Sequence, residues 1–107
     1  MEPDPRAVYK VCSASEWRDA VAGGAYRGSA VDVRDGFIHL STGVQLAETL
    51  RRHFAGQRDL VLVEVDARDL GDDLRWEPSR DGDLFPHLYG VLPVALARGV
   101  SPVDAPG

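Results

Sequence analysis

This sequence has one cysteine, few aromatic residues and no long apolar run. Cys12 has no second cysteine to pair with, so an internal disulfide is excluded, which fits a reducing compartment or a fold that is indifferent to redox state. No apolar stretch approaches the roughly 20 residues that a membrane-spanning helix needs. The amino terminus lacks the basic segment and following apolar segment of a signal peptide. We therefore expect a cytoplasmic protein without a membrane partner.

An excess of positive charge is also lacking. The 107 residues include 12 Lys and Arg against 17 Asp and Glu, a formal net charge of −5. This balance argues against nucleic-acid binding by bulk electrostatics, although a local basic pocket is compatible with it. A Gly-rich phosphate-binding loop and a Gly-x-Ser-x-Gly nucleophile elbow are both absent from the sequence.

What remains is the composition of an ordinary globular domain. The hydrophobic share is 44% and the charged share 27%, and no repeat, linker or low-complexity block interrupts the chain. We predict a single α+β domain over residues 1–107, with its core at about 7–100 and loose termini. Its architecture is expected to be two helices packed on two short β-sheets.

Hydrophobic periodicity and capping patterns predict the elements. The first helix, 13–22, begins with Ser13 and Glu16, buries Trp17, Ala20 and Val21, and ends at a Gly-Gly pair. A second helix is expected to have Thr42 as its N-cap, with Gln45 completing the capping box, after a connecting segment at 25–34. The apolar run at 60–65 predicts a central strand, and Pro86 predicts an edge strand or bulge at 84–90. Further strands are expected at 7–12, 37–40, 74–77 and 93–100, a helical turn at 66–71 and an exposed loop at 78–83.

The stretch 35–54 is the best candidate for a ligand site. Asp35-Gly36 predicts a turn, and strand alternation places His39 on the face opposite Ile38 and Leu40. The helix that follows begins close to the end of this strand. A histidine beside the free backbone N–H groups of a helix start suits an anionic or polar ligand.

The three histidines leave several chemistries open. His39 and His87 are candidates for ligand contact, whereas His53 lies in a basic helix end that the helix dipole already favours. Three imidazoles suit catalytic zinc, but no pair has the close spacing of a helix-borne zinc motif, so we assign no metal ligands. Cys12 and Ser41 are weaker candidates for a nucleophile, and Glu77 is the carboxylate best placed to enter a cleft.

Three tyrosines combine an apolar ring with a polar tip. Tyr9, Tyr26 and Tyr89 could each stack on a flat ring and donate a hydrogen bond. For each one taken singly, a half-buried position in the core is the simpler alternative.

Several segments of the chain form a recognisable set. They are Val-Tyr-Lys-Val, Trp17, the Gly23–Tyr26 turn, Asp-Gly-Phe-Ile-His-Leu-Ser-Thr, Arg-Arg-His-Phe, Leu-Val-Leu-Val-Glu-Val-Asp and Leu-Phe-Pro-His-Leu-Tyr-Gly. Together they resemble the uncharacterised bacterial family called domain of unknown function 952. The resemblance spans about residues 8–100. Its most specific parts lie at 36–42 and 85–90.

A more distant similarity links the order of elements to the catalytic lobe of the tRNA 2′-phosphotransferases, which have the ADP-ribosyltransferase fold. This resemblance implies a cleft between two small sheets that holds NAD. It places Lys10 where that fold has histidine or arginine on its first strand, matches His39 to the histidine of a His-Leu-Ser strand, and puts the third motif near His87 and Tyr89.

The same resemblance implies roles for residues around the ligand. Catalytic roles fall to His39, His87 and Tyr89, and Tyr9 or Tyr26 is expected to stack on the base. The diphosphate is expected to meet Arg27 or Arg51, and Lys10, Ser41 and Thr42 complete the contacts.

Three functional hypotheses follow. The first is an ADP-ribosyltransferase-like domain that binds or cleaves NAD, as substrate, or a related nucleotide. The second is a non-catalytic module that binds a nucleotide or small anion in the same cleft. The third is a metal-dependent hydrolase built on the three histidines. The first two require His39 and His87 to line one hollow.

Overall fold

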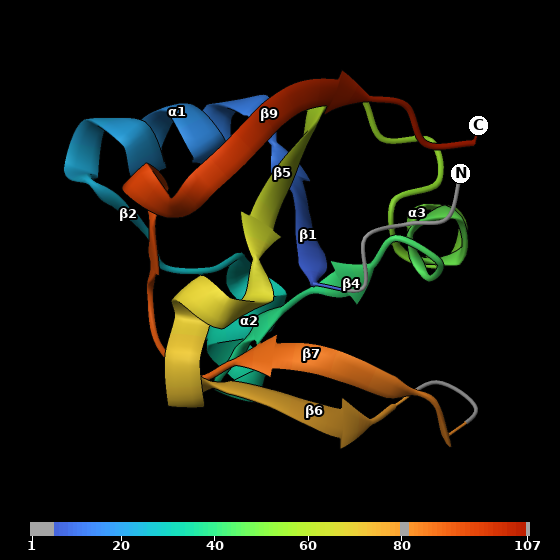
Figure 1. Ribbon diagram of the computed structural model, residues 1–107. Coiled ribbons are helices and arrows are strands. Elements are labelled where there is room, and N and C mark those ends of the chain that lie inside the picture. The colour runs from blue at the N-terminus through green and yellow to red at the C-terminus, as the bar shows by residue number, and fades with distance from the viewer. Residues whose placement is uncertain (1–5, 80–81, 107) are drawn as a thin grey trace.

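The computed structural model describes residues 6–79 and 82–106. Over these residues the chain forms three sheets and three α-helices, an α+β arrangement (Figure 1). The predicted class is confirmed, but the predicted count of two helices and two sheets is wrong. The additional elements are short, because α2 (Ala30–Asp35) has 6 residues and the sheet of β2 (Ala25–Tyr26) and β8 (Leu92–Pro93) has two-residue strands. Elements of this length carry no readable periodicity.

The other helices are α1 (Ala14–Gly23), α3 (Leu46–His53) and the 3-10 turns η1 (Ala67–Asp73) and η3 (Val94–Leu96). The other strands are β1 (Ala7–Ser13), β3 (Ile38–His39), β4 (Ser41–Thr42), β5 (Leu60–Asp66), β6 (Leu74–Pro78), β7 (Leu84–Leu88) and β9 (Ala97–Val103).

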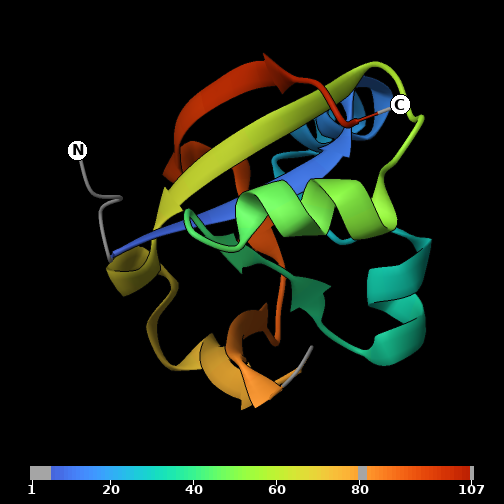
Figure 2. The same ribbon diagram turned by 90° about the vertical axis from the view of Figure 1, so that its right-hand side faces the viewer.

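The largest sheet is antiparallel, with the strand order β4-β1-β5-β9. Strand β5 pairs with β1 on one side and with β9 on the other, so the predicted central strand at 60–65 is confirmed. Val63 and Val65 of this strand are fully buried. Helices α1 and α3 lie on opposite sides of the sheet, and α3 crosses β1 (Figures 1 and 2).

Two groups of buried side chains hold the layers together. The larger joins the sheets and α1 through residues that include Val8, Trp17, Ile38 and Leu88. The smaller seats α3 on the sheet through Val11, Leu50 and Leu60. Full burial of one such aliphatic or aromatic side chain stabilises the fold by roughly 1.5–3 kcal/mol.

The three-stranded sheet has the order β3-β7-β6, and it overturns the prediction for Pro86. Pro86 lies buried in the middle strand instead of at an edge. Its carbonyl oxygen accepts a hydrogen bond from Leu40 N at 3.0 Å, beyond the end of the two-residue β3. The register of the two strands puts Leu40 opposite Pro86, and the proline has no N–H to return this hydrogen bond, so the pairing of β3 with β7 ends here.

Helix α1 begins as predicted. Glu16 N donates to Ser13 Oγ at 3.0 Å, Ser13 N donates to Glu16 Oε1 at 3.2 Å, and Gly24 closes the helix at φ 88°. Trp17 is buried, but the predicted burial of Val21 is wrong, because its side chain is 55% exposed. The buried stripe of α1 is narrower than the sequence suggested.

Helix α2 lies where the sequence predicted a connecting segment. Asp32 N donates to Ser29 Oγ at 3.3 Å, and Ser29 N donates to Asp32 Oδ2 at 2.9 Å, which together make a capping box. The predicted turn at Asp35-Gly36 is the end of this helix. Gly36 adopts φ 88°, a left-handed conformation that glycine accepts without steric cost.

The predicted start of α3 is three residues early, because Thr42 was expected as the N-cap and Gln45 has that position. Thr42 N donates to Gln45 Oε1 at 3.0 Å, and Gln45 N donates to Thr42 Oγ1 at 3.3 Å. These reciprocal bonds close a turn that precedes the helix, which begins at Leu46. The predicted reciprocal hydrogen bonds do form, but they stabilise the link between β4 and α3 and do not cap α3.

The strands at 7–12, 74–77 and 84–90 and the turn at 66–71 match β1, β6, β7 and η1. The last strand, β9, begins later than predicted, because β8 and η3 occupy residues 92–96. Near the end of the chain, Gly56 N donates to Pro106 O at 3.0 Å. The expected loose residues 1–5 lie outside the described part of the chain. None of the helices described is both long enough and apolar enough to cross a membrane.

Candidate functional site

The register of β3 against β7 brings His39 beside His87. The two residues are direct cross-strand partners, and their ring centroids lie 5.6 Å apart in an edge-to-face arrangement. Phe37 lies against both rings. It stacks on His87 with centroids 4.1 Å apart and contacts His39 at 4.6 Å. Two histidines far apart in the sequence therefore share one aromatic cluster.

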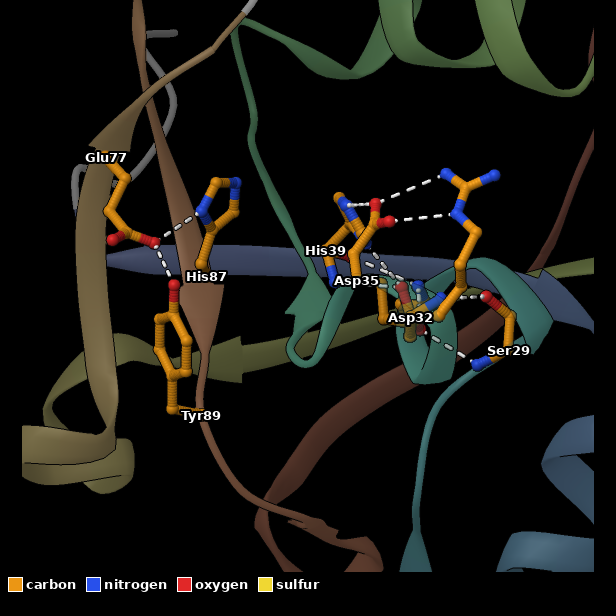
Figure 3. Close-up of polar contacts among 9 residues, drawn as sticks. Ser29, Asp32, Asp35, His39, Glu77, His87 and Tyr89 are labelled. Carbon is orange, nitrogen blue, oxygen red and sulfur yellow. Dashed lines mark hydrogen bonds and ion pairs between the residues drawn. The ribbon is translucent and has the colours of Figure 1, made fainter.

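His39 lies between two carboxylates (Figure 3). Its Nδ1 is 2.7 Å from Asp32 Oδ1, and its Nε2 is 3.1 Å from Asp35 Oδ2. The hydrogen bond from Arg34 lowers the pKa of Asp35, which keeps this carboxylate ionised. Because an ionised carboxylate only accepts hydrogen bonds, both contacts are satisfied together when the imidazole carries both protons.

Asp32 is the hub of this half of the site. Its carboxylate accepts from Lys10 Nζ at 2.7 Å, and the two side chains are 2% and 5% exposed. It also accepts from the backbone nitrogens of Ser29 and His39. Burial alone raises the pKa of Asp32, but hydrogen bonds from His39 and the charge of Lys10 outweigh burial and hold it well below its usual range.

His87 has a different set of partners. Its Nδ1 lies 2.8 Å from Glu77 Oε1, and Tyr89 Oη donates to the same oxygen at 2.7 Å (Figure 3). The hydrogen bond from Tyr89, followed by the one from His87, lowers the pKa of Glu77. The side chain of His87 is only 7% exposed, against 36% for His39.

Both histidines line a cavity of about 630 Å³. Its walls come from β1 and β4 of the large sheet, from β3 and β7 of the small sheet, and from α2 and α3. His53, from the last turn of α3, also lines it, so all three histidines of the sequence reach one cavity. This volume falls in the range of small-molecule sites.

A family model described as "Protein of unknown function (DUF952)" matches residues 11–100 of this chain. The chain belongs to the DUF952 family. The resemblance expected from the sequence is thereby confirmed, and the family description gives no activity.

Solved structures of protein CC0527 from Caulobacter crescentus are similar to this chain. The X-ray structure has a TM-score of 0.90 and 50% sequence identity, covering 92% of this chain and 86% of that one. The solution NMR structure has a TM-score of 0.83 and 49% identity, with 92% and 85% coverage. No curated protein matches the chain.

In this member of the DUF952 family, the cavity collects most of the residues that the sequence singled out. His39, His87, Tyr9, Lys10 and Ser41 all line it. Lys10 does so as a buried ion-pair partner, because its ammonium group also donates to His39 O at 3.1 Å. Its charge is therefore directed mainly at the protein.

Four other predicted residues do not line the cavity. Tyr26 is 3% exposed and packs near Trp17 in the core, so stacking on a ligand base does not fit its position. Arg27 is exposed, and Thr42 is engaged with Gln45. Tyr89 lies behind His87 and reaches the site through Glu77.

The three histidines are not arranged as ligands of one metal ion. Within the described residues, no group of three or more His, Cys, Asp or Glu side chains is arranged to hold a metal ion. Cys12 lines the cavity but is buried, and burial raises the pKa of its thiol to about 11. A thiol in this form is a poor nucleophile.

Sequence reasoning missed two groups of site residues. Asp32 was assigned to a connector, although the spacing of Ser29 and Asp32 is itself a helix-start signal. Arg52 and Thr49 of α3 line the cavity, whereas the expected diphosphate contact Arg51 pairs with Glu48 outside it. No local signal distinguishes these neighbouring arginines, because the choice depends on how α3 packs on the sheet.

Proposed function

We propose that this chain binds NAD or a related nucleotide in the cavity between its two larger sheets. The observation that carries the proposal is the pairing of His39 with His87 on the wall of that cavity, with Nδ1 of each ring held by a carboxylate. Imidazoles oriented in this way present fixed polar groups to a ligand. The similarity of the His-Leu-Ser segment to the ADP-ribosyltransferase fold supports the choice of nucleotide.

The walls of the cavity suit the parts of such a ligand. Apolar side chains, including Leu40, Phe54 and Phe85, offer contact area for a base. Arg52 supplies a cationic group and His53 a polar ring near the α3 end, where a diphosphate would be recognised by charge and hydrogen bonds. Neither residue was among the diphosphate contacts that the sequence predicted.

The reaction implied by the resemblance is cleavage of the bond between nicotinamide and ribose. Nicotinamide leaves with the bonding electrons, and positive charge develops on the sugar. A site that accelerates this step must stabilise that charge more strongly than it binds the substrate. The resemblance gives His39 the role of orienting a ribose hydroxyl or a phosphate oxygen, and in this site Nε2 would have to exchange the Asp35 carboxylate for the ligand to do so.

A second candidate is binding without catalysis, and one observation favours it. The carboxylates behind the histidines are already occupied. Asp32 is neutralised by Lys10, and Glu77 accepts from His87 and Tyr89. Their negative charge is therefore directed at the protein's own groups and less at a developing charge on the sugar.

Thermal unfolding with NAD and with ADP-ribose tests the proposal. Ligand at 100 times Kd stabilises the folded state by about 2.7 kcal/mol, which raises the Tm of a domain of this size by roughly 10 °C. We expect such a rise with either compound, and measuring nicotinamide release then separates the enzyme from the binding module. An unchanged Tm with both compounds would rule out the nucleotide site.

Two neighbouring arginines provide a matched control. Arg52 lines the cavity and Arg51 does not, yet both are exposed residues of α3 that pair with Glu48. Arg52→Ala is expected to weaken the Tm rise caused by NAD, and Arg51→Ala to leave it intact. Equal loss in both variants would indicate a general charge effect and contradict a diphosphate contact at Arg52.

A further inference from the structure

The hydrogen bonds of His87 define which of its ring nitrogens carries the proton. Glu77 Oε1 forms a hydrogen bond with His87 Nδ1 at 2.8 Å and accepts a second one from the Tyr89 hydroxyl at 2.7 Å. An ionised carboxylate has no proton to donate, so Nδ1 must be the donor in this contact. The neutral ring then carries its proton on Nδ1 and a lone pair on Nε2.

The other ring nitrogen is the one left for a ligand. Nε2 lies on the side of the ring away from Glu77 (Figure 3), and it has no hydrogen-bond partner among the described residues. Because His87 lines the cavity, Nε2 is the polar atom that this side chain can offer to a ligand there.

The orientation of the ring is fixed from two directions. Glu77, itself held by the Tyr89 hydroxyl, bonds one edge of the ring, and Phe37 stacks on one face at 4.1 Å with an interplanar angle of 24°. A 180° ring flip would put Cδ2 in the place of Nδ1 and break the hydrogen bond to Glu77. In the neutral ring, the lone pair of Nε2 therefore has a fixed direction.

We propose that Glu77 and Tyr89 make His87 a hydrogen-bond acceptor, so that this wall of the cavity selects a ligand group that donates, a hydroxyl or an amide N–H. An anionic oxygen is disfavoured here, because it would face the lone pair. Glu77 and Tyr89 act as positioning residues through His87.

This inference concerns the same cavity as the proposed function and depends on that function for the identity of the ligand. In NAD, the donors are the ribose hydroxyls and the carboxamide NH₂. The diphosphate would lie at the part of the cavity that Arg52 lines. The two histidines then differ in role, since His39 faces acceptors with both of its nitrogens.

Nitrogen NMR of the full chain with ¹⁵N-labelled histidine tests the assignment directly. Long-range proton–nitrogen correlations report which ring nitrogen is protonated. At a pH where His87 is neutral, we expect a proton on Nδ1 and none on Nε2. A spectrum of the free protein with the proton on Nε2 would overturn the inference even if NAD binds. With Nε2 unprotonated, failure of NAD and ADP-ribose to bind would count against the proposed function alone.

Adding ADP-ribose gives a second test. If Nε2 accepts a hydrogen bond from the ligand, its resonance shifts while the nitrogen stays unprotonated. If an anionic oxygen binds at this wall instead, Nε2 gains a proton, and that result would contradict the proposal. Glu77→Leu removes the acceptor for Nδ1, so we expect a population protonated on Nε2 and about tenfold weaker binding of ADP-ribose, the size of one lost hydrogen bond.

Glu64→Leu is the matched control. Glu64 is also a strand residue with an ion pair, and its side chain is 36% exposed against 35% for Glu77. This control is expected to change neither the His87 tautomer nor the affinity. An unchanged tautomer in Glu77→Leu would overturn the positioning role of Glu77, and thermal unfolding of each variant verifies that it is folded.

Discussion

His39 and His87 are neighbours across one sheet, but their surroundings differ in depth and in charge. Behind His39 lies a buried ion pair, in which Asp32 and Lys10 are 2% and 5% exposed. Behind His87 lies Glu77, which is 35% exposed and has a neutral tyrosine as its second donor. The first arrangement is part of the core of the fold, and the second is a peripheral support for one ring. We therefore expect mutations on the His39 side chiefly to lower stability, and mutations on the His87 side chiefly to weaken the proposed ligand binding.

The largest effect is expected for Asp32→Ala. The change leaves the Lys10 ammonium buried without its counter-ion, and breaking a buried pair in this way costs about 3–5 kcal/mol. Urea denaturation measures the free energy of unfolding. Asp35→Ala removes the exposed carboxylate on the other nitrogen of His39 and should leave that free energy unchanged within error. Equal costs for the two variants would contradict the contrast between a core ion pair and a surface contact.

An intermediate effect is expected from acid. The pKa of Asp32 is lower in the folded protein than in the unfolded chain, where it is about 3.9. Its contribution to stability is therefore complete above that unfolded value and disappears as the pH falls through the folded value.

Denaturant unfolding between pH 5 and about pH 2 measures this loss. Asp32→Asn is expected to give a shallower dependence on pH than the wild type, because the ionised group is gone. Other carboxylates with lowered pKa, Asp66 among them, contribute equally to both proteins. Parallel pH profiles for the two proteins would show that Asp32 is not a source of acid sensitivity.

The smallest effect is expected for Tyr89→Phe on the His87 side. Tyr89 is the largest cause of the lowered pKa of Glu77, so removing its hydroxyl should raise that pKa toward the ordinary value. A carboxyl ¹³C titration by NMR follows Glu77 directly. The pKa of Asp35, which depends on Arg34, serves as the internal reference and should not move. An unshifted Glu77 would mean that the hydroxyl is not its partner in solution.

Local sequence patterns predicted much of the fold. The apolar run at 60–65 and the Ser13–Glu16 capping box each gave an element of the right kind in the right place, because each signal lies within the element. Helix α2 was not predicted, because so short a helix shows no periodicity. Part of its stability also comes from Lys10, which lies on a strand distant in the sequence. The prediction for Pro86 was wrong because the proline nitrogen faces the short strand β3, so its missing N–H ends that pairing and leaves the pairing of β7 with β6 in place.

The candidate site was predictable only in part. Strand alternation put His39 on the face away from Ile38, and the mixed segment around His87 marked it as unusual. The convergence of the two rings depends on the register of β3 and β7, which no local pattern contains. The same is true of their partners, since nothing near Asp32 or Glu77 in the sequence shows which histidine each contacts.

The ion pair of Lys10 also bears on how the protein opens. Its ammonium group bridges the first strand of the large sheet, the Asp32 carboxylate of α2 and the backbone of β3. Suppose that the small sheet moved away from the large one while both stayed folded. The Lys10 ammonium and the Asp32 carboxylate would then be separated while still poorly hydrated. Each unpaired charge raises the free energy of such a state. We therefore expect the two layers to unfold in one cooperative transition.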